Sequence, residues 1–220
     1  MRFLRALGFS VLLAMVTQPA SATITDIPFC NGAISCVLTS TPPNPVVPDP
    51  NDGTLLVWNE VQNLTLTSAL RVDRVFDSLA PFINDLGNGE FEIVAGTVIS
   101  SHYIQWDPGN DSSNLVVAYL DADAQTYAVI ASDQNFSASD ALLGLTGVDY
   151  GTFSNRSLEA NDITNFNTAT LVLSWEASSP GEWARLITGY SAVADVPVPP
   201  GAAMVASLLP MAMLIKRRRR

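Results

Sequence analysis

Residues 168–177, TATLVLSWEA, alternate between large apolar side chains and smaller or polar ones. Because successive side chains of an extended chain point to opposite sides, Leu171, Leu173 and Trp175 share one face. The residues between them, among them Glu176, occupy the other face. This pattern predicts a strand with one side against a core and the other toward solvent.

Similar runs recur along the chain, separated by turn-forming clusters at the spacing typical of sandwiches and barrels. The runs are TLLVWNE (54–60), VQNLTLTSALRV (61–72), GTVISSHYIQWDP (96–108), NLVVAYL (114–120), QTYAVIAS (125–132) and EWARLITGY (182–190). The turn clusters are NDLGNGE (84–90), DPGNDSSN (107–114) and SSPGE (178–182). SASDALLGL (137–145) predicts one short helix, capped by Ser139 or Asp140 and stopped by Gly144. The pattern predicts an all-β fold, an antiparallel β-sandwich with jelly-roll topology as the favoured variant.

The sequence divides into four expected segments. Residues 1–22 read as a signal peptide, and residues 23–52 as a cysteine loop followed by a proline-rich spacer. Residues 53–195 carry the strand pattern of the β-sandwich domain, and residues 196–220 form a separate C-terminal signal.

The N-terminal segment has the three parts of a secretory signal peptide. Arg2 and Arg5 supply positive charge, and residues 7–16 form an apolar run. Ala20 and Ala22 are the small residues expected at a cleavage site, which places the cut before Thr23. An uncleaved anchor helix is the alternative, although the run is short for a membrane span.

The chain between its two ends is strongly acidic. All 21 acidic residues lie between Asp26 and Asp195, together with only four of the 11 basic ones, so this part carries a net charge of −17. Such a surface repels phosphate backbones, and nucleic-acid binding is therefore not expected. It suits solubility outside the cell, or attraction of divalent cations.

The two cysteines, Cys30 and Cys36, allow one intramolecular disulfide. Export would place them in an oxidising compartment, where such a bond persists. A metal site is not expected, because no second pair of cysteine or histidine ligands lies nearby.

The C-terminal segment joins a proline motif, an apolar run and a basic end. A helix over residues 201–215 would span roughly 22 Å, short of the hydrocarbon core of about 30 Å. The five basic residues after it would stay in the cytoplasm and stop transfer. The motif residues are Val196, Pro197, Val198, Pro199 and Pro200, and the stop residues are Lys216, Arg217, Arg218, Arg219 and Arg220.

This combination of an export signal, an acidic body and a VPVPP–helix–basic tail resembles the PEP-CTERM class of bacterial sorting signals, in its VPLPA-CTERM variant. The resemblance implies that an exosortase, a membrane cysteine transpeptidase, cuts near the proline motif. It implies transfer of the body to the cell surface or the extracellular matrix of an exopolysaccharide-producing cell. The stretches LLVWNEVQNLTLTSALRVD, AGTVISSHYIQWDP and ASSPGEWARLIT resemble a recurring PEP-CTERM body for which no activity is implied. A permanent membrane anchor is the alternative interpretation of the tail.

The residues give little support for catalysis. His102 is the only histidine, and the neighbouring Ser100 and Ser101 point to other sides of an extended strand, which disfavours a Ser–His pair. His102 is expected to fill a strand position and bond to the backbone of a turn. No catalytic residue is therefore assigned.

Two kinds of ligand site stay open on the sequence alone. Carboxylates near the turns could hold structural calcium, although turn-forming Asp and Asn are common for backbone reasons. Among the four tryptophans, Trp106 beside a turn is the best candidate for a sugar-stacking ring, which keeps a carbohydrate-binding or carbohydrate-active module as an alternative. The possible calcium ligands are Asp107, Asn110, Asp111, Asp121 and Asp123.

The sequence thus predicts a non-enzymatic exported protein at the cell surface or in the extracellular matrix, with transient anchoring in the inner membrane. Its expected partners are signal peptidase, an exosortase-like enzyme, the membrane and extracellular polysaccharide.

Overall fold

The structure is a computed structural model that describes residues 24–46, 53–109, 113–151, 156–167, 170–178 and 181–190. Strands dominate these residues, with one short helix, and nearly all strand pairs are antiparallel. The expected all-β class is confirmed. The signal peptide and the C-terminal segment lie outside the described residues. Within the described part of the chain, no helix is long and apolar enough to cross a membrane.

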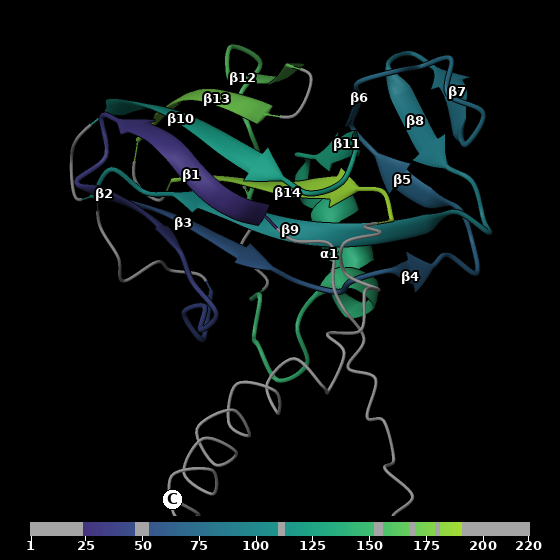
Figure 1. Ribbon diagram of the computed structural model, residues 1–220, viewed down its shortest axis with the longest axis horizontal. Coiled ribbons are helices and arrows are strands. Elements are labelled where there is room, and N and C mark those ends of the chain that lie inside the picture. Colours follow the sequence, from purple (N-terminus) through teal and green to yellow (C-terminus); the bar gives the residue numbers. More distant parts are fainter. Residues whose placement is uncertain are drawn as a thin grey trace, which may run out of the picture. The chain divides into compact units, whose positions relative to one another are not determined.

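A four-stranded antiparallel sheet forms one layer (Figure 1). Its strands follow the order β1, β10, β13, β12. The run that opens the sequence argument is β13, and its alternation is confirmed, because Leu171, Leu173 and Trp175 are buried while the residues between them are not. The bounds are β1 Ile24–Asn31, β10 Asn114–Ala122, β13 Thr170–Ala177 and β12 Ile163–Asn167.

A seven-stranded sheet forms the second layer, in the order β2, β3, β9, β14, β11, β6, with β4 also paired to β9. All pairs are antiparallel except β2 with β3, which is parallel. The bounds are β2 Ser35–Leu38, β3 Thr54–Asn59, β4 Leu64–Thr65, β6 Arg74–Val75, β9 Val98–Trp106, β11 Thr126–Ile130 and β14 Glu182–Thr188. A smaller sheet has the order β5 Leu70–Val72, β8 Glu90–Ile93, β7 Ile83–Gly87.

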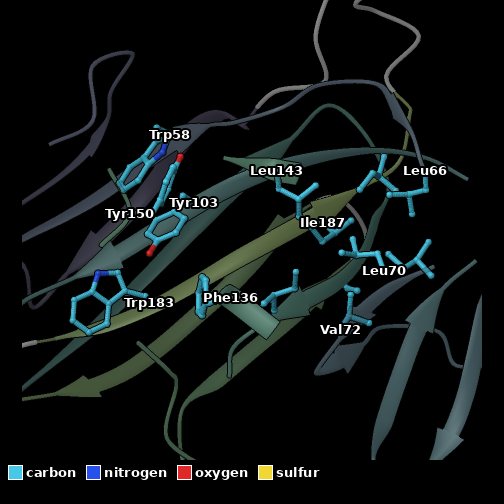
Figure 2. Close-up of a cluster of buried hydrophobic side chains, with 14 of the residues drawn as sticks. Trp58, Leu66, Leu70, Val72, Tyr103, Phe136, Leu143, Tyr150, Trp183 and Ile187 are labelled. Carbon is cyan, nitrogen blue, oxygen red and sulfur yellow. The ribbon is translucent and has the colours of Figure 1, made fainter. Parts of the chain in front are cut away.

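Apolar side chains cover both faces of the seven-stranded sheet. One core cluster joins it to the four-stranded sheet through residues such as Val57, Ile104, Val116 and Leu173. The second cluster lies on its other face, where helix α1 (Asp133–Leu143) packs (Figures 1 and 2). Because the sheet is enclosed on both sides, every residue of β14 is buried, and the strand lacks the polar face that β13 keeps.

Helix α1 begins earlier than the sequence predicts. Its N-cap is Ser132, whose Oγ accepts a hydrogen bond from the backbone N–H of Asn135, so Ser139 and Asp140 lie inside the helix. The carboxylate of Asp73 fixes this start, because it accepts bonds from Ser132 Oγ at 2.7 Å and from Asn135 Nδ2 at 2.7 Å. The predicted end is confirmed at Gly144.

The expected boundary at residue 53 is wrong. β1 pairs with β10 in one sheet and β2 pairs with β3 in the other, so much of residues 23–52 belongs to the domain. The proline-rich stretch also packs against it as far as it is described, since Val46 is fully buried and the Asn44 side chain bonds to Gly147 and Asp149. Residues 47–52 lie outside the described part.

Candidate functional site

Trp106 does not lie on the surface. Its side chain is fully buried in the core between the two large sheets, and its Nε1 lies 3.5 Å from the carbonyl oxygen of Asn114. The other three tryptophans are also fully buried. The expected sugar-stacking role of Trp106 is therefore wrong, because a ring inside the core cannot meet a ligand.

His102 is buried in β9 between two side chains. Its Nδ1 lies 2.7 Å from Asn59 Oδ1 and its Nε2 lies 3.0 Å from Thr188 Oγ1. The expected backbone partner is thus replaced by side chains from the strands on either side. Burial lowers the pKa of the imidazole to about 3, so the ring stays neutral near pH 7.

The serines beside His102 have other partners. Ser101 Oγ donates to Glu60 Oε2 at 2.6 Å, and Ser100 Oγ accepts from the backbone N–H of Asn63 at 2.9 Å. Neither bond activates a hydroxyl through the imidazole, as a Ser–His nucleophile requires.

The proposed calcium ligands do not converge in the described part of the chain. Asp107 is buried and its Oδ1 accepts from the backbone N–H of Gly109, while Asn110 and Asp111 lie outside the described residues. Asp121 Oδ1 accepts from Thr170 Oγ1 at 2.6 Å near the far end of β10. Seven residues of strand, roughly 23 Å, separate Asp121 from the end of β10 that lies by Asp107. Asp123 follows just after β10.

The predicted disulfide is present between Cys30 and Cys36, with 6.0 Å between the Cα atoms. It joins β1 of the four-stranded sheet to β2 of the seven-stranded sheet. The processing residues Ala20, Ala22, Thr23 and 196–200, and the basic residues 216–220, lie outside the described residues.

A buried ionic network links β14 to the residue after β3 and to α1, and the sequence gives no sign of it. Arg185 Nε lies 2.6 Å from Glu60 Oε2, and Arg185 Nη2 lies 2.9 Å from Glu60 Oε1. Arg185 also reaches Ser139 Oγ at 2.8 Å and Asp140 Oδ1 at 3.1 Å. Arg156 pairs with the other oxygen of Asp140 at 2.6 Å. The Glu60 and Arg185 side chains are both 0% exposed.

Aromatic rings enclose this network (Figure 2). The guanidinium carbon of Arg185 lies 5.3 Å from the centre of the Tyr103 ring and 5.5 Å from those of Phe136 and Tyr150. Burial alone would lower the pKa of Arg185, but the Glu60 carboxylate outweighs it and raises the pKa above its ordinary value. A fully buried, mutually bonded set of this kind holds elements together and has no access for a substrate.

Glu182, the first residue of β14, is a second buried acid. Only 5% of the residue is exposed, and its Oε2 has no hydrogen-bond partner among the described residues. Burial raises its pKa to about 8, and the carboxylates of Asp162 and Glu159 add to the effect. Within the described ranges, no group of three or more His, Cys, Asp or Glu residues could hold a metal ion. A bound proton therefore neutralises this acid near pH 7.

A groove of about 640 Å³ runs beside β2 and β3. Side chains of the two strands form its floor, and the loop after β2 contributes three prolines to its wall. The groove carries neither a charge nor an aromatic ring. Its lining residues are Ser35, Val37, Thr39, Thr41, Pro42, Pro43, Asn44, Pro45, Thr54 and Leu56.

The outer face of the four-stranded sheet carries apolar side chains that no described element covers. We use "outer face" for Phe29, Leu115, Val117, Tyr119, Ile163 and Val172, which lie opposite the buried side of the sheet. The rings of Phe29 and Tyr119 lie 4.8 Å apart between centres and are 42% and 38% exposed. Sequence reasoning missed this face, because the register of β1 against β10 brings together residues 90 positions apart.

Comparison with known proteins finds no matching family model, no matching curated protein and no matching solved structure.

Proposed function

We propose that this chain is an exported, non-catalytic β-sandwich protein that is displayed at the cell surface or in the extracellular matrix. In this proposal signal peptidase removes the N-terminal segment and an exosortase-like enzyme cuts near residues 196–200, after transient anchoring in the inner membrane. The observation that carries the proposal is the Cys30–Cys36 disulfide between the two large sheets, since such bonds persist in oxidising compartments outside the cytosol.

The sandwich assignment rests on the core shared by the four-stranded and seven-stranded sheets. A jelly-roll would place the first and last strands of the motif side by side. Here β1 and β14 belong to different sheets, so we propose a β-sandwich of another strand order.

The non-catalytic part of the proposal is supported by the fate of the reactive side chains. His102 is held neutral between two side chains, and the Arg185 network is closed to solvent. A carbohydrate-active enzyme needs two carboxylates across an open cleft, whereas the groove beside β2 and β3 is lined by uncharged residues.

The test is to express the chain in its native host, fractionate the cells, and alkylate free thiols before analysis. We expect the protein outside the inner membrane with both cysteines protected. A variant with alanine at residues 196–200 should remain with the membrane and keep its tail. Wild-type protein found in the cytosol with alkylated cysteines would refute the proposal. Wild-type protein that keeps its tail in the membrane would favour a permanent anchor.

A further inference from the structure

We propose that the outer face of the four-stranded sheet is a binding site for neutral polysaccharide, with Phe29 and Tyr119 as the rings against which sugar residues pack. The inference rests on the proposed extracellular location, because that is where such a face would meet polysaccharide.

The register of the sheet places these rings at the centre of the face. Phe29 lies opposite Tyr119, Tyr119 opposite Val172, and Val172 opposite Asn165, so one row crosses all four strands. Cross-strand partners share a face of the sheet. Leu115 and Ile163 are each 48% exposed and extend the apolar surface beside this row.

Polar side chains that can bond to hydroxyl groups border the apolar row. Asn165 lies within it, and the row on one side pairs Val117 with Ser174. Glu176 lies opposite Leu115, and Asp121 lies opposite Thr170. A surface that offers apolar rings beside carboxylate, amide and hydroxyl groups matches the two sides of a sugar ring, one of C–H groups and one of hydroxyls.

Charge restricts the class of polysaccharide. β1, β10, β12 and β13 contain no lysine, arginine or histidine, and their outward residues include Asp121 and Glu176. An anionic polymer would meet unpaired carboxylates and would be repelled. The same argument disfavours nucleic acid and an anionic lipid surface.

The size of the face argues against a second copy of this chain as its occupant. Four strands about 4.8 Å apart, paired over some eight residues, give on the order of 500 Å². A stable dimer buries roughly 800 Å² on each partner. An extended glycan needs a strip only a few residues wide, and the exposed row is such a strip.

The test is affinity electrophoresis of the protein purified from its native host, in gels that contain laminarin, dextran or a soluble β-1,4-glucan, with alginate as the acidic comparison. We expect retardation by at least one neutral glucan and none by alginate. The double variant Phe29→Ala/Tyr119→Ala should weaken binding at least about tenfold. Leu79→Ala, which truncates an exposed apolar side chain elsewhere, should bind like wild type.

Several outcomes would overturn the inference. They are retardation by no neutral glucan, retardation by alginate alone, or unchanged binding by the double variant. Loss of binding in Val37→Thr would assign the ligand to the groove instead. A dimer that disappears in the double variant would make a second copy the occupant. Phe29→Leu/Tyr119→Thr serves if the alanine variant fails to fold. The export experiment can succeed while this one fails, because binding is measured on folded protein irrespective of its route.

Discussion

The buried ion pair between Glu60 and Arg185 offers the sharpest test of how the domain is held together. Replacing Glu60 with Gln keeps the shape of the side chain but removes its charge. The new amide nitrogen would place a donor against the Arg185 guanidinium, which only donates. Arg185 would then keep only Asp140 and Ser139 as partners in a site closed to water.

The expected cost follows from burial. Breaking a fully buried pair by removing one partner costs about 3–5 kcal/mol, because the remaining charge is left without compensation. Gln retains one acceptor for Ser101 and Arg185, so we expect a value near 3 kcal/mol. The chain supplies a matched control in Arg71 and Glu90, which pair at 2.8 Å with side chains 56% and 64% exposed. Glu90→Gln should cost at most about 1 kcal/mol.

The assay is urea unfolding of wild type, Glu60→Gln and Glu90→Gln at pH 7 with the disulfide intact. With a urea dependence of about 2 kcal/mol per molar, Glu60→Gln should lower the midpoint by about 1.5 M and Glu90→Gln by 0.5 M or less. Equal midpoints for the two variants would refute the reasoning, since they would mean that burial adds nothing to the Glu60 pair.

Three further changes test other parts of the fold. Glu182 has a folded-state pKa of about 8 against a model value of 4.5, so the folded state holds a proton that the unfolded state releases between those values. Stability should therefore fall as pH rises through this interval, by at most about 1.4 kcal/mol per pH unit. In Glu182→Gln this loss should be absent, which unfolding at pH 5, 6, 7 and 8 measures. Gly32→Ala should destabilise by about 2–3 kcal/mol, because φ is +92° and a Cβ would overlap the carbonyl oxygen of Leu115; a melting temperature equal to wild type would contradict this. The double variant Cys30→Ser/Cys36→Ser should lose about 2 kcal/mol, the value for a loop with a sequence separation of 6, and its unfolding should become insensitive to reductant.

The fold class could be predicted wherever a strand has one wet face. β13 shows the alternation in its sequence, and β10 and β9 appear as continuous β-branched and aromatic runs. The hairpin of β7 and β8 was predicted only as a turn, because Asn88 and Gly89 signal the turn while the flanking strands are short and mostly exposed. β1 was missed since its pattern is interrupted by Pro28 and by two register shifts against β10.

The candidate sites could not be predicted, because each joins residues that are distant in sequence. Glu60 and Arg185 are 125 positions apart, and no local pattern pairs them. Trp106 was expected beside a turn and therefore near the surface, but the four-stranded sheet covers it. The start of α1 depends on Asp73, a residue 59 positions before the N-cap.

The most direct test of the proposed export and sorting is the intact mass of the protein recovered from the surface of its native host. The account predicts a chain that starts at Thr23, ends near residues 196–200, and lacks the two hydrogens lost on forming the Cys30–Cys36 bond. A mass that matches all 220 residues with both thiols free would contradict it.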